Sequence, residues 1–502
     1  MEFQKIKLHR SEKNRAAVTQ ITLDDDYNVP DYRQDIVKVI KERGELRFDE
    51  VKAMEGAAWI KGSLVFKVLY RSDKQEGKIS CLRGEIPFQE RLNMDGLSEY
   101  DAVHATGDME DLTIGVINSR KLNVRAVIVL TASSEKEVDE ELTCELSDGS
   151  SYEQNIVEKE ALKLLVVRRD ICRQKSEAVL PSSKPNIREI LWQSMQLRNV
   201  ESRLVEGKIR LSGEILVSIL YNDEEEGEHL SWYETTVPLD AQAECGVMED
   251  DCIWQVQMVP LTMELEVKPD YDGEERILVM ELALDTHIRI WKEEKIRLLT
   301  DLYSLQKEVK PVFRECPLER LLVKNAAKCR MTEQMELKED KEKVLQICSC
   351  EGKVLLERQE IKPDGVLAEG TVEVNILYIT PDDHMPVGAV QEIYPFSQLV
   401  EIPEMSAQAK VELDASLEQL SAVMLDQEHV EIRAAVRLDL IAFVQEVIQN
   451  IEEATESEPD LEMLRNRPGL VGYIAKAGDD LWTIAKERSE ERRVGKECRS
   501  RW

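Results

Sequence analysis

Hydrophobic and polar residues alternate in three short stretches of the chain that resemble one another. Each begins with glycine and ends with tyrosine; they are GSLVFKVLY at 62–70, GEILVSILY at 213–221 and GTVEVNILY at 370–378. In the first, Leu64, Phe66 and Val68 share one side with the closing tyrosine. The opposite sides carry Lys67, Ser218 and Asn375. A period of two is typical of β-strands that bury one face. We therefore predict three equivalent strands, marked by Gly62 and Tyr70, Gly213 and Tyr221, and Gly370 and Tyr378.

A proline follows each of these tyrosines after the same interval of 17 residues, at Pro87, Pro238 and Pro395. Proline has no N–H to donate to a neighbouring strand, so it belongs on an edge strand or at a strand start. The polar segments in between, RSDKQEG, NDEEEGE and ITPDDH, have the composition of turns. We predict that each turn leads from the first strand into an edge strand.

Apolar triplets with the spacing i, i+3, i+4 precede each of the three stretches. They are Ile36, Val39 and Ile40; Ile187, Ile190 and Leu191; and Val344, Ile347 and Cys348. This spacing is that of one face of an α-helix. Asp35 and Asn186 stand just before the first two triplets, where they would act as N-caps. We therefore predict that each repeated unit begins with a short helix.

The repeats divide the chain into tandem domains. We predict a mainly β fold with short helices, of class α+β, in which each repeat is a sandwich. Acidic segments rich in serine or glutamate are predicted to be exposed linkers. The expected divisions are repeats at 15–132, 163–292 and 320–445, acidic linkers at 133–162 and 446–468, and a more apolar connector at 293–319.

The net charge of the chain limits the classes of molecule that it is expected to bind. The 502 residues carry a formal net charge of -33, which repels nucleic-acid phosphates and anionic lipid and favours a cationic protein partner. The first residues, MEFQKIKLHRSEKNRAAVTQ, lack the apolar centre of a signal peptide, and no stretch is apolar enough to span a membrane. We expect a protein of the cytoplasm.

The sequence contains few residues that could form a catalytic or metal-binding site. Ten cysteines without a CxxC pair are typical of reduced thiols and do not suggest a disulfide scaffold or a zinc site. The six histidines fall at unrelated positions of the three repeats, and the motifs of nucleotide-binding, triad and metalloprotease enzymes are missing. Three β-rich units that share no common cluster of polar residues favour a surface for docking of other proteins over an enzyme. We predict no enzyme activity, no cofactor and no metal site.

A different motif, YIAKAGDDLWTIAK, occupies residues 473–486. The pattern predicts a strand at 473–475, a turn at Gly478 and a helix capped by Asp479. The inner face of this helix would consist of Leu481, Trp482, Ile484 and Ala485.

This string resembles the LysM module over 13 consecutive positions. LysM modules are βααβ units that typically bind N-acetylglucosamine polymers, and only the first strand and helix are present here. We expect a partial module at 469–488 and an atypical basic tail at 489–502, which we interpret as a truncated or artefactual end. The resemblance implies a partner-binding groove that contains Lys476, Gly478, Asp479, Asp480, Leu481, Trp482 and Ile484.

With this motif in view, the glycine-to-tyrosine stretch and its spaced proline resemble the SPOCS domain of endospore-forming bacteria. Several SPOCS domains followed by a LysM module are similar to a morphogenetic protein of the spore coat. The resemblance implies a non-enzymatic scaffold in the mother-cell cytoplasm that tethers coat material to the forespore surface. In that family the LysM module binds a self-assembling coat ATPase. The alternative is a peptidoglycan-binding wall protein or an accessory of a wall hydrolase, which would require export.

Overall fold

The structure is a computed structural model of the chain. It describes residues 1–72, 77–147, 151–224, 229–249, 251–304, 307–337, 343–403, 405–406, 409–458, 474 and 480–487.

Almost all of the described residues lie in β-strands, which confirms the predicted mainly β fold. Repeat 1 contains β1 (Phe3–Asn28), β2 (Lys38–Met54), β3 (Ala57–Arg71), β4 (Ile79–Asn93), β5 (Val103–Asn118) and β6 (Lys121–Leu146). Repeat 2 contains β7 (Glu153–Val179), β8 (Ile187–Val205), β9 (Lys208–Asp223), β10 (Leu230–Glu244), β11 (Cys252–Pro269) and β12 (Glu275–Tyr303). Repeat 3 contains β13 (Glu308–Glu336), β14 (Gln346–Lys362), β15 (Gly365–Ile379), β16 (Val387–Glu401), β17 (Lys410–Met424) and β18 (His429–Ser457). The short helix α2 (Leu481–Glu487) follows.

Each repeat consists of two three-stranded antiparallel sheets packed face to face. In repeat 1 the sheets have the orders β2-β3-β4 and β1-β6-β5, and repeats 2 and 3 have the same topology. The strands alternate apolar and polar side chains, so the inner faces of both sheets supply one apolar core per repeat. In repeat 1, for example, Phe66 of β3 and Ile128 of β6 belong to one buried cluster.

The three predicted short helices are not present, because the apolar triplets lie in or beside bulged strands. Pairing shifts register between Val39 and Lys41, between Ile190 and Trp192, and between Ile347 and Ser349. Each shift leaves one unpaired extra residue in the strand. Beyond this residue, the alternation of inward and outward side chains is displaced by one position. A strand with this bulge therefore reproduces the i, i+3, i+4 spacing of a helix. The expected N-caps accept side-chain hydrogen bonds instead, Asp35 from Arg120 and Asn186 from Arg276.

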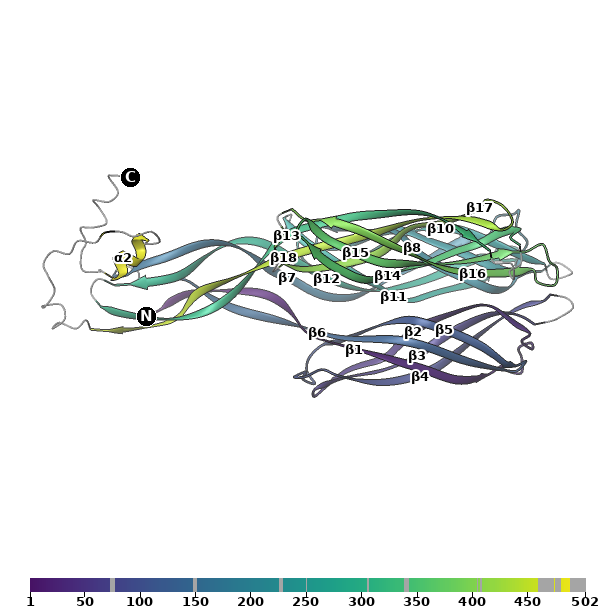
Figure 1. Ribbon diagram of the computed structural model, residues 1–502, viewed down its shortest axis with the longest axis horizontal. Coiled ribbons are helices and arrows are strands. Elements are labelled where there is room, and N and C mark those ends of the chain that lie inside the picture. The colour runs from purple at the N-terminus through teal and green to yellow at the C-terminus, as the bar shows by residue number, and fades with distance from the viewer. Residues whose placement is uncertain are drawn as a thin grey trace.

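Most of the described residues in the segments predicted as linkers also lie in strands, while residues 148–150 and 459–468 lie outside the described part of the chain. Residues 133–146 continue β6, residues 153–162 begin β7, and residues 446–457 continue β18. The connector at 293–319 is the end of β12 and the start of β13. Figure 1 shows that the ends of these long strands extend beyond the sandwiches of the repeats and form a stalk. Acidic composition misled the prediction, because strands that are exposed along one face need few apolar residues.

Three two-stranded ribbons, β1–β6, β7–β12 and β13–β18, make up the stalk. Leu142, Leu298 and Ile448, one from each ribbon, lie in one buried cluster. Asn450, also buried, donates to the carbonyl oxygens of Thr143 at 2.9 Å and of Leu299 at 3.1 Å. Its own side-chain oxygen accepts from the Thr143 N–H at 2.8 Å. The stalk is therefore one packed unit with its own core.

The three repeats close into a ring around the long axis of the molecule. β4 contacts β8, β10 contacts β14, and β16 contacts β2, so each repeat touches the next and the third touches the first. Equivalent leucines from the middle strands, Leu69, Leu220 and Leu377, are fully or almost fully buried in one shared cluster. The bulge residues Ile40, Leu191 and Cys348 lie in or against the same cluster. The chain is thus a pseudo-threefold assembly made from one polypeptide.

Candidate interaction sites

The signature glycines lie opposite bulges in the neighbouring strand. A Cβ added to Gly62 would lie 2.4 Å from the Arg47 carbonyl oxygen, and one added to Gly370 would lie 2.2 Å from that of Leu355. The corresponding distance at Gly213 is 2.9 Å, to Arg198. Pairing shifts register beside all three glycines. Only glycine leaves room for the bulged backbone to approach so closely.

The signature tyrosines are fully buried in all three repeats. The Tyr70 hydroxyl donates to the Gln34 carbonyl oxygen at 3.1 Å, and that of Tyr221 donates to Pro185 at the same distance. Burial raises the pKa of both phenols to about 12, so they stay protonated donors. These two tyrosines therefore attach the loop between the first and second strands of their repeat to the middle strand of its sheet.

The signature prolines occupy edge strands, as predicted. Pro87, Pro238 and Pro395 are exposed on β4, β10 and β16, the outer strands of their sheets. Gly62, Tyr70, Pro87 and their counterparts therefore each have a structural role in the sandwich.

A buried carboxylate at the ring junction joins all three repeats. Glu351 of repeat 3 accepts from Lys41 Nζ at 3.1 Å and Arg43 Nη1 at 3.2 Å, both in repeat 1. It also accepts from the indole N–H of Trp192, in repeat 2, at 3.0 Å. Burial alone would raise the pKa of Glu351, but the two cations and the indole donor outweigh burial and hold that pKa below its usual value. Because the donors differ between repeats, this contact fixes the order of the lobes.

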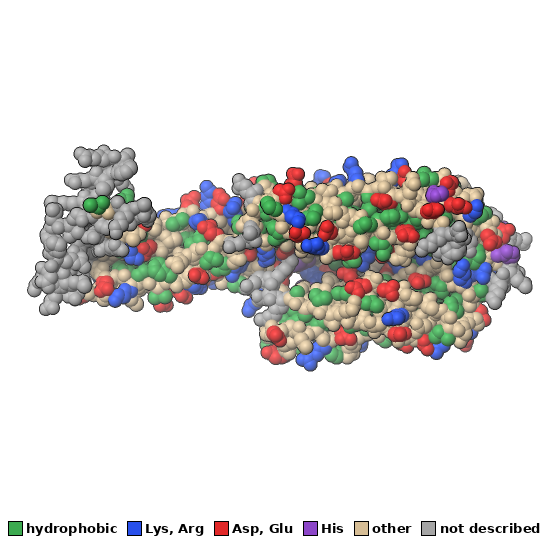
Figure 2. Space-filling model, viewed as in Figure 1, with side chains coloured by type: hydrophobic (Ala, Val, Ile, Leu, Met, Phe, Trp, Pro, Cys, Tyr) green, Lys and Arg blue, Asp and Glu red, His purple; other side chains and the backbone are tan. Residues whose placement is uncertain are grey.

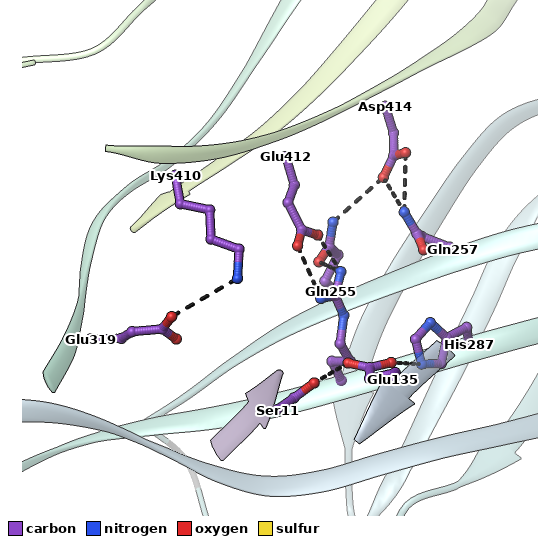
Figure 3. A network of polar contacts seen from close by, with 10 residues as sticks. Ser11, Glu135, Gln255, Gln257, His287, Glu319, Lys410, Glu412 and Asp414 are labelled. Atoms are coloured by element: carbon purple, nitrogen blue, oxygen red, sulfur yellow. Dashed lines mark hydrogen bonds and ion pairs between the residues drawn. The ribbon is translucent and has the colours of Figure 1, made fainter. Parts of the chain in front are cut away.

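A second polar network links the repeats near the base of the stalk (Figure 3). Buried Arg289 donates to Glu412 of repeat 3 at 3.1 Å and to Gln255 at 2.6 Å. Glu135 of repeat 1 accepts from Ser11 and pairs with His287 Nε2 of repeat 2 at 3.0 Å. Burial opposes ionisation of Glu135, yet hydrogen bonds from His287 and Ser11 bring its pKa down to about 2.

His104 of repeat 1 lies beside this network, with its ring centroid 6.3 Å from that of His287. Burial, followed by the charges of Arg169 and His287, lowers the pKa of His104 to about 4. This histidine is therefore neutral at physiological pH. Both networks carry complementary charges without a nucleophile aimed at an open site, which is the arrangement of an interface between repeats.

The stalk tip holds α2, the helix of the LysM-like motif (Figure 1). The Trp482 indole N–H donates to Asp301 Oδ2 at 2.7 Å, and Lys486 Nζ lies 2.6 Å from Asp301 Oδ1. The Trp482 ring meets the Tyr303 ring edge-on at a centroid distance of 5.1 Å. Asp301 and Tyr303 belong to the end of β12, so the helix is anchored to the stalk through Trp482.

Two details of the predicted motif are corrected. Asp480, and not Asp479, caps the helix, because its carboxylate accepts from the N–H groups of Trp482 at 2.5 Å and of Thr483 at 3.2 Å. Leu481 and Ala485 were both predicted on the inner face, but both are exposed, and Leu481 is 70% exposed. Ile484 is half-buried, as its place on that face predicts. Lys476, Gly478 and Asp479 lie outside the described residues, as does most of the predicted strand at 473–475.

The described residues form neither a metal site nor a membrane-spanning helix. Among those residues, no three metal-ligating side chains come close enough to hold an ion. In the same part of the chain, no helix has the length and hydropathy needed to cross a membrane.

Lys41, Trp192 and Glu351 were not predicted as a site, although a comparison of equivalent positions in the three repeats could have indicated them. Residues 41, 192 and 349 occupy equivalent positions and are lysine, tryptophan and serine; residues 43, 194 and 351 are arginine, serine and glutamate. Copies that otherwise match in pattern differ in charge at these two positions. Such differences within a repeat mark the places where the copies meet one another.

Comparison with known proteins agrees with the threefold repeat. A family model described as SipL, SPOCS domain matches residues 35–117, 186–268 and 343–425. No curated protein sequence matches the chain, and no solved structure does. The three matched segments run from the loop before β2, β8 and β14 to the ends of β5, β11 and β17, and so cover the same elements in each repeat. The chain therefore belongs to the SipL SPOCS-domain family and carries three copies of the domain.

Proposed function

We propose that this protein is a non-enzymatic scaffold for spore-coat assembly, which acts in the mother-cell cytoplasm at the forespore surface. Its SPOCS domains indicate a sporulation-related protein, and this family is not a known family of enzymes. The observation that carries the proposal is the closed ring of three SPOCS domains with a stalk. A rigid body of this kind holds surfaces at fixed separations, which suits an adaptor better than a catalyst.

The C-terminal motif on the stalk is the proposed contact to a self-assembling coat ATPase. Its exposed apolar side chain, Leu481, and its capping carboxylate, Asp480, lie at the far end of the molecule from the ring. An exposed leucine beside a fixed carboxylate is a typical element of a protein-binding surface. The contact to Asp301 holds the helix in place without covering Leu481.

The test is capture of the purified coat ATPase by the full-length protein, by a form without residues 469–502, and by Leu481→Ala. We expect both changes to abolish or strongly reduce capture. Leu481 is exposed, so its variant should keep the thermal stability of the unchanged protein. Val447→Ala, which removes an exposed apolar side chain from the stalk strand β18, serves as a matched control and should retain capture.

Retention on insoluble peptidoglycan, without capture of the ATPase, would support the alternative of a wall-binding protein. Equal capture by the full-length and shortened forms would show that the C-terminal motif is not the contact.

A further inference from the structure

A groove of about 630 Å³ lies where repeat 1 meets repeat 2. Its first wall belongs to repeat 1 and includes Arg43, Lys67 and Arg83. Its second wall belongs to repeat 2 and includes residues 261–266 of β11. Figure 2 shows that the lobe of repeat 1 is separated from the other two by a furrow along the ring.

The first wall carries a row of three cations. Arg43 pairs with Lys67 across β2 and β3, and Lys67 pairs with Arg83 across β3 and β4, so the three side chains lie side by side on one face. Like charges in directly opposite positions destabilise a sheet. Arg43 is balanced by Glu351 and Glu45, whereas neither Lys67 nor Arg83 forms an ion pair with a described residue.

Lys67 is also largely removed from solvent. Its ammonium lies 5.7 Å from the centroid of the Trp192 ring, and burial lowers its pKa, with the neighbouring arginines adding to the effect. The charge of Glu45 partly offsets this lowering, but Glu45 forms its ion pair with Arg43, and a desolvated cation without an ion pair of its own is unfavourable. An incoming anionic group at this wall would relieve that cost.

The cation row exists in repeat 1 alone. The equivalent cross-strand row in repeat 2 is Ser194, Ser218 and Glu234, and that in repeat 3 is Glu351, Asn375 and Gln391. Ser218 is buried, and β8 beside it contacts β17 of the next repeat. At the contact between repeats 2 and 3 the central position is therefore a small, neutral serine, whereas at the groove between repeats 1 and 2 it is a lysine.

The second wall offers a strand edge. Six consecutive residues of β11 line the groove, although neighbouring residues of a strand point to opposite faces. The groove must therefore run along the edge of the strand. β11 is the outer strand of its sheet, and its free backbone groups are available for pairing.

From the cation row and the free edge together, we propose that this groove binds an extended acidic peptide segment of a partner protein. The peptide adds as a strand along β11 and directs the carboxylates of alternate residues to Lys67 and Arg83. Its other side chains face Thr262, Glu264 and Glu266 and are neutral or basic. A peptide can keep its carboxylates away from these glutamates because its side chains alternate, whereas a nucleic acid carries a phosphate at every residue and would bring some of them against Glu264 and Glu266.

The test uses a fluorescein-labelled peptide of alternating glutamate and threonine, with binding to the full-length protein measured by fluorescence anisotropy. The variant Lys67→Ser, Arg83→Glu carries the residues that repeat 2 has at these positions. We expect it to lose at least about tenfold in affinity. Lys353→Ser removes a cation that pairs with Asp108 at another seam and should leave binding unchanged.

Two further probes separate the parts of the proposal. A peptide with lysine in place of glutamate should not bind. The glutamate peptide with N-methyl groups along one backbone edge should also fail, because it cannot pair with β11. Arg83→Glu alone provides an exposed substitution that preserves the fold, as a thermal melt will verify.

The proposal is overturned by any of three results. These are no measurable binding of the glutamate peptide to the unchanged protein, equal affinity of the double variant, or equal competition by a single-stranded RNA. None of these measurements involves the C-terminal motif, so the outcome is independent of the proposed scaffold contact.

Discussion

Glu351 shows at the scale of one residue how three similar domains are held in a fixed order. It lies where the repeats meet and takes its hydrogen-bond donors from the other two repeats. A buried ion pair contributes little when compared with apolar packing, but removal of one partner leaves the other charge uncompensated.

We therefore expect Glu351→Gln to lower the free energy of unfolding by about 3 kcal/mol, because Lys41 and Arg43 lose their counter-charge. Denaturant titration will measure the change. Glu357→Gln, on an exposed position of the same strand, should change stability by less than about 1 kcal/mol. Similar effects of the two substitutions would show that the junction charge is not needed.

His104 predicts how the stability of the ring depends on pH. Its folded pKa of about 4 lies below the usual value of 6.5, so between these values the unfolded chain binds a proton that the folded chain does not. Stability contributed by the neutral histidine is therefore complete above pH 6.5 and is lost as pH falls toward 4. We expect His104→Gln to reduce the loss of unfolding free energy between pH 7 and pH 5. Identical pH profiles would contradict this assignment.

At the scale of single elements, the bulges explain both the signature and the main error of prediction. Gly62 and Gly370 face bulged strands that leave no space for a Cβ. Bulges beside the ring junction also place Ile40, Leu191 and Cys348 against the shared cluster. The bulges that gave these strands the apolar spacing of helices therefore also provide contacts between the repeats.

Alanine substitution tests the role of the glycines. We expect Gly62→Ala and Gly370→Ala each to cost about 1–3 kcal/mol, since the added Cβ would collide with a carbonyl oxygen. Gly115→Ala is the matched control, because Gly115 also lies in a strand but has no atom within 4 Å of the new Cβ. Thermal melts of the three variants will measure the differences. A control as unstable as the other two would point to backbone entropy instead of crowding.

The strands, their edge prolines and the threefold repeat could be predicted because they depend on local patterns. Alternation around Tyr70 and the fixed distance to Pro87 are visible in one copy and confirmed by the other two. The bulge at Ile40 was not predictable, because an extra residue in a strand and one turn of a helix share the same spacing. The stalk was missed because strands without a fully buried face were read as acidic linkers.

At the scale of the whole molecule, the ring makes the three domains interdependent. The junction cluster around Leu69, Leu220 and Leu377 has one leucine from each, and the stalk core likewise needs all three ribbons. Neither core is complete in an isolated repeat. This arrangement depends on contacts between residues far apart in sequence, which a single sequence does not disclose.

We expect the protein to unfold in one cooperative transition, with equal calorimetric and van't Hoff enthalpies. Domains joined by flexible linkers would instead unfold as separate units. Differential scanning calorimetry distinguishes the two outcomes, and three resolved transitions would contradict the ring.

Because the three repeats belong to one polypeptide, their sequences can change independently, unlike those of the subunits of a homotrimer. In an assembly of identical subunits, every substitution occurs three times around the axis, so no seam can change alone. Here each seam is encoded separately, and repeat 1 can hold Lys67 where repeat 2 holds Ser218. The molecule keeps the geometry of a trimer while its three contacts between repeats differ in chemistry, so a substitution at one of them leaves the other two as they were.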